Sequence, residues 1–186
     1  MMYYTKVLKS GHGLAKTLLE RAPNISLDWD LRQKSRFETT NSLGCQVGVV
    51  IPRGQVLRGQ DVLVSEDGSF LKVLAKDQPV LRITFCAEHG SVFDLTRAAY
   101  HLGNRHVPIE LRQGYLQIEP DHVLASMLEQ MHLIVHEITA PFEPETGAYS
   151  EESKLGHGHG HGHGHAHTHQ HGLKSDHDHH GQDTKA

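Results

Sequence analysis

The first 76 residues are patterned as short runs of alternating or β-branched apolar residues, with turn-forming residues between them. Alternation with a period of two predicts strands, because successive side chains of a strand point to opposite faces. The pattern predicts strands at residues 3–8, 25–30, 45–51, 60–64 and 69–74. Helical spacing is weak here apart from residues 14–21. Asp67-Gly68 lies between two apolar runs and predicts a tight hairpin, because both residue types tolerate a positive φ. A small all-β domain over residues 1–76 is expected.

From residue 77 onward, segments with strand-like spacing of apolar residues alternate with segments with helix-like spacing. Residues 79–86 alternate apolar and polar side chains and predict a strand. Residues 91–102 carry apolar side chains at helical spacing, which places them in one stripe along a helix. Ser91 can cap the start of this helix. Gly103 is expected just beyond its end, where a left-handed residue commonly stops a helix.

The rest of this segment repeats the pattern. Residues 106–111 and 115–118 predict two short strands joined as a hairpin, and Asp121 can cap a second helix. Residues 133–138 predict a final strand. The order β-α-β-β-α-β is the ferredoxin-like arrangement, an antiparallel sheet with two helices on one face, and it is expected over residues 77–150. The chain is therefore expected to be an α+β protein.

The last segment, residues 151–186, differs in composition, because it holds 11 of the 18 histidines of the chain and only four hydrophobic residues. A segment with so little to bury cannot form a core, so a disordered histidine-rich tail is expected. A second cluster at residues 176–180 combines three histidines with two aspartates. The main run places a histidine at every second position: His157, His159, His161, His163, His165, His167, His169 and His171.

Metal binding is the function that this tail composition favours. Neutral imidazole suits Ni²⁺, Cu²⁺ and Zn²⁺ and prefers none of them uniquely. Ordering a flexible chain costs about 1 to 2 kcal/mol of backbone entropy per residue, which predicts high capacity with modest affinity per ion. An engineered tag, a neutral linker and a pH-responsive tail, whose charge changes near the imidazole pKa of about 6.5, are the other interpretations.

Charge, hydropathy and cysteine content narrow the function classes. The formal net charge is −4, so no basic surplus is present to bind nucleic acid. The sequence has no apolar run of the about 18 residues that cross a membrane, and its first residues lack a secretory pattern, so a cytoplasmic protein without membrane contact is expected. Cys45 and Cys86 are too few for a disulfide framework and are expected to be small buried thiols.

Two histidines outside the tail are candidate metal ligands. His106 follows a tight connection at a helix end, where its ring can be presented to a ligand. One histidine cannot hold an ion by itself, but a symmetric dimer with this loop near its axis would supply two. His122 follows Asp121 at the start of the second helix and is either a peripheral ligand or an exposed neighbour of the cap.

The other histidine pairs are weaker candidates. Cys86 and His89 form a C-x-x-H half-site at best. His132 and His136 would share one face of a strand about 13 Å apart, too far to chelate one ion together.

A further candidate lies in the first domain. Trp29, Arg32 and Arg36 can form a binding face, or Trp29 can be an aromatic core residue beside two solvated arginines.

Several segments closely resemble one protein family. Residues 97–108 read RAAYHLGNRHVP, residues 121–124 read DHVL, and residues 141–149 read PFEPETGAY ahead of the histidine-rich end. Residues 51–68, IPRGQVLRGQDVLVSEDG, look like the N-terminal domain of the same family. The chain resembles, over essentially its whole length, the urease accessory protein E family, the nickel metallochaperones of urease maturation.

The resemblance implies a homodimer with a peptide-binding-like N-terminal β domain and a ferredoxin-like C-terminal domain that dimerises. It implies that His106 of the GNRH motif is the essential Ni²⁺ ligand and meets its symmetry mate at the interface. A peripheral H-x-H pair of some members falls on Pro120 and His122, so only His122 can serve. The implied partners are a urease accessory GTPase and, through it, the urease apoprotein complex. Cu²⁺ and Zn²⁺ are expected to bind in vitro as well.

Three functions stay open at this point. The first is a non-enzymatic nickel chaperone with His106 at its centre and the tail histidines as supply. The second is a general divalent-metal store or detoxification protein that acts through the tail. The third is a peptide- or protein-binding adaptor that uses the β domain. The sequence contains no H-E-x-x-H, Walker or G-x-S-x-G motif that would indicate an enzyme.

Overall fold

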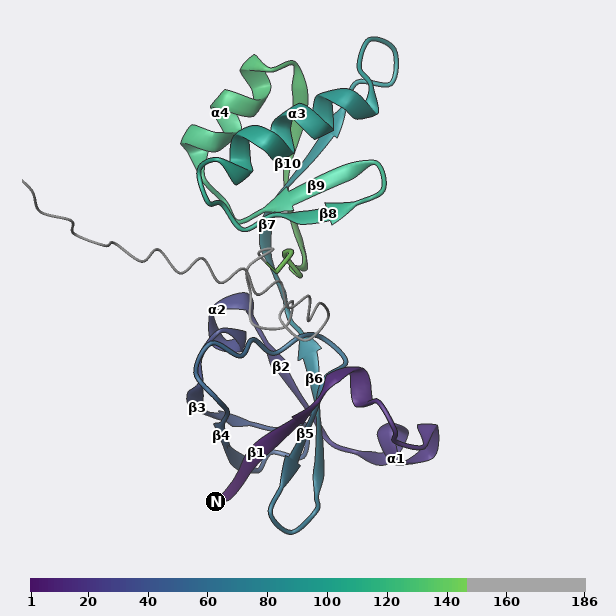
Figure 1. The fold of residues 1–186 in the computed structure, drawn as a ribbon, viewed down its shortest axis with the longest axis vertical. Coiled ribbons are helices and arrows are strands. Elements are labelled where there is room, and N and C mark those ends of the chain that lie inside the picture. Colours follow the sequence, from purple (N-terminus) through teal and green to yellow (C-terminus); the bar gives the residue numbers. More distant parts are fainter. Residues whose placement is uncertain (147–186) are drawn as a thin grey trace, which may run out of the picture. The chain divides into compact units, whose positions relative to one another are not determined.

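The computed structural model describes residues 1–146, in which two sheets carry short and medium-length helices (Figure 1). The mixed α+β composition expected from the sequence is present. The predicted tail at residues 151–186, with both of its histidine clusters, lies outside the described residues. Among the residues described, no helix is long and apolar enough to cross a bilayer.

The first six strands form one sheet in the order β2-β6-β5-β1-β4-β3. β1 pairs with β4, and β2 with β6, in parallel, whereas the other neighbours are antiparallel. We call these strands and their connections the six-stranded module. Its elements are β1 Met2–Leu8, η1 Lys9–Gly11, α1 Lys16–Arg21, β2 Asn24–Leu27, α2 Trp29–Arg32, β3 Arg36–Thr40, β4 Gln46–Val50, β5 Val62–Ser65 and β6 Phe70–Ala75.

Alternating residues of these strands build the first core. Ile25 and Leu27 of β2, Val47 and Val49 of β4, and other apolar side chains pack together in it. The hairpin predicted at Asp67-Gly68 joins β5 to β6, and Gly68 has the positive φ of 82° that such a turn requires.

Three features of this module differ from the sequence prediction. The domain expected to be all-β contains the short helices α1 and α2, because the chain turns between its strands. The strand predicted at residues 25–30 ends at Leu27, because the Asp28 carboxylate accepts a 2.9 Å hydrogen bond from Leu31 N and starts the short helix α2. Strand β3 was not predicted. It lies at the edge of the sheet, and Phe37 is its one buried residue, so its sequence lacks a strong alternation.

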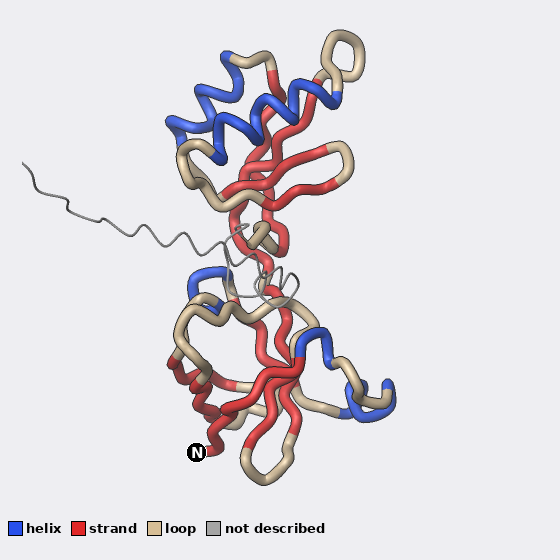
Figure 2. The backbone as a smooth tube through the Cα atoms, in the orientation of Figure 1, coloured by secondary structure: helices blue, strands red, loops and turns tan. Residues whose placement is uncertain are grey.

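The last four strands form an antiparallel sheet in the order β10-β7-β9-β8. Helices α3 and α4 both lie on one face of it (Figures 1 and 2). We call this part the four-stranded module. Its elements follow the chain order β7 Asp77–Phe85, α3 Val92–Gly103, β8 Glu110–Arg112, β9 Tyr115–Ile118, α4 His122–Gln130 and β10 Leu133–Pro141.

Both helices of this module begin at their predicted caps. Ser91 N donates a 2.8 Å hydrogen bond to the Asp94 carboxylate at the start of α3. The Asp121 carboxylate accepts hydrogen bonds from Val123 N and Leu124 N at the start of α4. The helices cover the sheet with a second core that contains Leu95, Ala98 and Leu102 of α3, Leu128 of α4, and Ile83, Leu116 and Ile118 of the strands.

A third, smaller core joins residues of the two modules. Trp29 of α2 packs with Val80 of β7, Ala140 of β10 and Phe142. The Trp29 and Phe142 rings meet edge to face, with centroids 6.1 Å apart and planes at 83°. Phe142 has no exposed surface, so the segment after β10 is anchored against α2.

Candidate functional site

His106 lies in the turn that ends helix α3. His106 N donates to Gly103 O (2.9 Å), and Val107 N donates to Leu102 O (3.2 Å). These two bonds form the Schellman motif, in which one residue adopts the left-handed conformation and is most often glycine. That residue here is His106, with φ 56°. The prediction that Gly103 takes this position is wrong, because Gly103 belongs to the helix itself.

The backbone at His106 therefore carries strain that glycine would avoid. A left-handed residue with a Cβ costs roughly 1–2 kcal/mol, and strained residues of this kind cluster at functional sites. Residues 106–109 are not a strand, contrary to the predicted strand at 106–111, because the chain turns here and pairs only from Glu110. The His106 side chain is exposed and available to a ligand.

His106 lines an open hollow of about 470 Å³, which we call the His106 hollow. Its wall is mostly apolar, and Glu145 is the other residue with a side chain of metal-ligand type. The lining includes Trp29, Ala99, His106, Ile109, Leu111 and Glu145. Glu145 N donates a 2.8 Å hydrogen bond to Ile109 O, which ties the segment after β10 to the connection that carries His106.

The described residues of one chain do not form a closed metal site. Among residues 1–146, no group of three or more His, Cys, Asp or Glu side chains is placed to hold an ion. An exposed imidazole with few neighbouring donors leaves coordination positions open.

His122 is the first residue of α4 and is exposed. With Pro120, Asp121 and Glu137 it lines a separate hollow of about 460 Å³. Asp121 is occupied as the helix cap, and Pro120 has no side-chain donor. The structure is therefore consistent with both interpretations of His122, as an exposed neighbour of the helix cap and as a peripheral ligand.

Cys86 and His89 lie in the loop between β7 and α3, with Sγ and Nδ1 3.8 Å apart. The hydrogen bond from His89, together with backbone N–H groups of Glu88 and His89, lowers the pKa of the Cys86 thiol to about 7. The prediction of buried thiols is wrong for both cysteines, because Cys45 is exposed and Cys86 is half-buried. Both are reduced.

The remaining histidine pair is not brought together on one strand. His132 lies in the turn before β10, with a left-handed φ of 63°, and His136 lies within β10 opposite Arg82. Both side chains are exposed.

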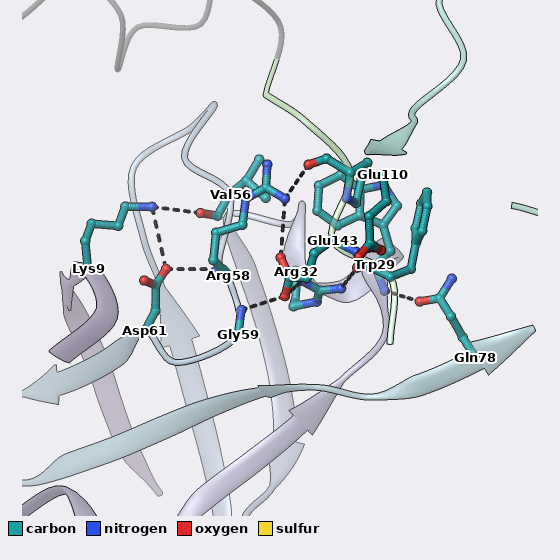
Figure 3. Close-up of polar contacts among 12 residues, drawn as sticks. Lys9, Trp29, Arg32, Val56, Arg58, Gly59, Asp61, Gln78, Glu110 and Glu143 are labelled. Atoms are coloured by element: carbon teal, nitrogen blue, oxygen red, sulfur yellow. Dashed lines mark hydrogen bonds and ion pairs between the residues drawn. The ribbon is translucent and has the colours of Figure 1, made fainter. Parts of the chain in front are cut away.

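Sequence reasoning missed an ionic cluster around Trp29 (Figure 3), a residue that also lines the His106 hollow. Arg32 has no exposed surface and donates from Nη1 to Glu143 Oε1 at 2.6 Å. It also donates from Nη2 to Phe142 O. The interpretation of Arg32 as a solvated arginine is wrong, whereas Trp29 is a core residue and Arg36 is exposed. The one signal for this cluster was the PFEPE segment at residues 141–145, which held the acidic partner.

Glu110 is a buried carboxylate that adjoins this cluster. Its Oε1 accepts from Arg112 Nε at 2.7 Å, and its Oε2 accepts from Glu143 N at 2.7 Å. The segment that carries Glu143 is therefore held by side chains from both modules.

Comparison with known proteins identifies relatives along the whole described chain. Residues 4–76 match the family described as UreE urease accessory protein, N-terminal domain, and residues 78–184 match its C-terminal domain. The urease accessory protein UreE of Polaromonas sp. JS666 is 65% identical over 150 residues, which cover 81% of this chain and 68% of that protein.

Two further relatives bear the same name. The protein of Albidiferax ferrireducens is 64% identical over 81% of this chain and 86% of its own length. The protein of Verminephrobacter eiseniae is 57% identical over 84% of this chain and 94% of its own length. With both family domains matched and identities of this size, the chain belongs to the UreE urease accessory protein family.

Proposed function

We propose that this protein is a nickel metallochaperone, which binds Ni²⁺ and delivers it during assembly of the urease active site. The observation that carries the proposal is His106, an exposed imidazole held in a left-handed position that usually requires glycine. A strained and exposed histidine adds little to the stability of the fold, so binding of a ligand explains its presence better. Family membership supports the role in urease maturation.

A homodimer would complete the site. The outer face of α3 exposes Val92, Phe93 and Tyr100, each with 66% of its surface accessible, and His106 follows the end of this helix. Phe93 and Tyr100 are seven positions apart and so share one face of the helix. Large exposed apolar side chains grouped in this way are typical of an interface. Packing of α3 against its symmetry mate would bring two His106 rings toward one ion.

We propose the same domain organisation as the sequence predicts. Residues 1–76 would be the β domain, residues 77–150 a ferredoxin-like domain for metal binding and dimerisation, and residues 151–186 the histidine-rich tail. The strand order β10-β7-β9-β8 with both helices on one face supports the ferredoxin-like assignment. The matched ranges 4–76 and 78–184 support a boundary near residue 76.

The tail histidines, at residues 157–171, would collect Ni²⁺ and supply it to the His106 pair, and His122 would be an auxiliary ligand. The receiving partners would be a urease accessory GTPase and, through it, the urease apoprotein complex, in the cytoplasm. Because the His106 site has few protein ligands, donors of a partner can coordinate the ion before the first imidazoles dissociate. The protein would pass the ion on without catalysing a reaction. Cu²⁺ and Zn²⁺ would compete in vitro, because imidazole binds them as well.

A general metal store is the second candidate, favoured by the eight-histidine run alone. The two proposals are separated by calorimetric Ni²⁺ titration of the full chain, of a chain that ends at Ser150, and of His106→Ala. His132→Ala is a matched control, because His132 is also exposed and left-handed beyond a helix end.

The chaperone proposal predicts that the tightest binding step survives truncation and His132→Ala but is lost in His106→Ala. Sedimentation should give a dimer of the truncated chain. If truncation removes every tight step and His106→Ala changes none, the store is the better description.

A further inference from the structure

The His106 hollow is not built by the four-stranded module alone. Trp29, which belongs to α2 of the six-stranded module, lines the same hollow as His106. The indole is almost fully buried, and its Nε1 has no hydrogen-bond partner among the described residues. The position of the Trp29 indole therefore depends on packing and on nearby charges. A change that shifts the indole also alters the wall of the hollow.

Two arginines hold the indole in place. The guanidinium carbons of Arg32 and Arg58 lie 5.2 Å and 5.1 Å from the centre of the Trp29 ring, within the range of cation–π attraction. Burial lowers the pKa of Arg32, and the charge of Glu143 acts in the opposite direction. A buried guanidinium of this kind requires a paired carboxylate.

Glu143 is the carboxylate that pairs with both arginines (Figure 3). Its Oε1 accepts from Arg32 Nη1 at 2.6 Å and from Gly59 N at 2.7 Å, and its Oε2 accepts from Arg58 Nη1 at 3.3 Å. A Cβ at position 59 would lie only 2.9 Å from Oε1, so glycine provides the space for this contact.

The backbone around Glu143 is fixed on the opposite side, by the four-stranded module. Glu143 N donates to Glu110 Oε2, and two residues later Glu145 N donates to Ile109 O. Ile109 and Glu145 both line the His106 hollow. One short segment thus connects the arginines that hold Trp29 with two further lining residues of the hollow, Ile109 and Glu145.

We propose that Glu143 is a positioning residue for the metal site. Its side chain holds Arg32 and Arg58 against Trp29, and its backbone holds Glu145 on Ile109. Glu143 thereby sets the shape of the hollow and, through it, the affinity of His106 for nickel. This inference rests on the proposed function, and it makes the six-stranded module a contributor to metal affinity.

The test uses the full chain and its single tryptophan as the probe. Bound Ni²⁺ quenches nearby indole emission, so titration with NiCl₂ reports binding at the hollow without a label. We expect Glu143→Gln to weaken this quenching step by about tenfold, the size of effects that groups behind metal ligands produce. Arg58→Gln should also weaken the quenching step. This variant is less prone to misfold than Glu143→Gln, because the Arg58 side chain is partly accessible to solvent. Glu38→Gln, an exposed change on β3, is the control.

Near-ultraviolet circular dichroism without nickel separates positioning from general stability, because it reports the packing of the folded chain. If Glu143 acts through the hollow, Glu143→Gln and Arg58→Gln keep the folded spectrum and bind nickel about tenfold more weakly. If Glu143→Gln and Arg58→Gln both fold and bind nickel as the unaltered chain does, the inference is overturned while the proposed function stands. If His106→Ala itself leaves the quenching step unchanged, the proposed function fails instead.

Discussion

Arg32 and Glu143 lie 111 positions apart in the chain, and their side chains meet at 2.6 Å in a partly buried ion pair. Arg32 has no exposed surface and Glu143 retains 21%. Such a pair is costly to break, because removal of one partner leaves an uncompensated charge in a poorly solvated place. It is also a fixed link between α2 and the segment that follows β10.

The first prediction concerns this link. Arg32→Ala is expected to lower the free energy of unfolding by about 2–5 kcal/mol, because it empties the space of a fully buried side chain that packs on Trp29. Arg58→Ala should cost less, about 1 kcal/mol, because Arg58 is partly solvated. Urea unfolding measures both values. Equal and small losses would contradict the burial of Arg32.

The second prediction concerns the backbone at His106. Glycine is favoured over alanine at a left-handed position by about 1 kcal/mol, so His106→Gly should be more stable than His106→Ala by that amount. Both variants should lose tight nickel binding. The same comparison at His132, with φ 63°, should reproduce the difference in stability without any loss of nickel binding. An alanine variant more stable than the glycine variant at position 106 would show that the turn is not left-handed.

The third prediction separates the cap of α4 from its neighbour. Asp121→Ala should destabilise the protein by about 1 kcal/mol, because Val123 N and Leu124 N lose their acceptor. His122→Ala should leave the unfolding midpoint unchanged, because His122 is exposed. Thermal unfolding with and without NiCl₂ is the measurement. A His122 variant that loses nickel-dependent stabilisation would identify His122 as a ligand.

The fourth prediction concerns the pH dependence of Cys86. Its pKa is lowered to about 7 from an ordinary 9.0, so the reactive thiolate forms at lower pH. At pH 7.5 about three quarters of the thiol is ionised, compared with about 3% at the ordinary pKa. In a Cys45→Ser background, the rate of alkylation by iodoacetamide should therefore level off by about pH 8. His89→Ala removes the main cause, and its rate should still be rising at pH 8.5.

Local patterns predicted much of the four-stranded module. The caps Ser91 and Asp121 and the strand at residues 115–118 are found where spacing and residue type placed them. These features depend on neighbours within a few positions. The end of α3 shows the limit of this reasoning, because glycine is the residue expected in a left-handed turn, and the chain places His106 there instead.

Contacts between distant segments could not be predicted in the same way. Nothing in the sequence around Arg32 indicates burial, because its counterion follows more than a hundred residues later. The edge strand β3 has one buried residue and so no readable alternation. His106 was identified as a candidate from its motif, whereas the contribution of Trp29 to the same hollow becomes visible only in three dimensions.

The pairing of β7 with β10 has a consequence for how this fold can be rearranged. The register runs from Leu133 opposite Phe85 to Pro141 opposite Asp77, so the first and last strands of the module enter and leave at one place. Paired residues of an antiparallel ladder lie only about 5 Å apart. The two ends of the four-stranded module therefore lie next to each other. A circular permutant of this module would need only a short loop between these two ends.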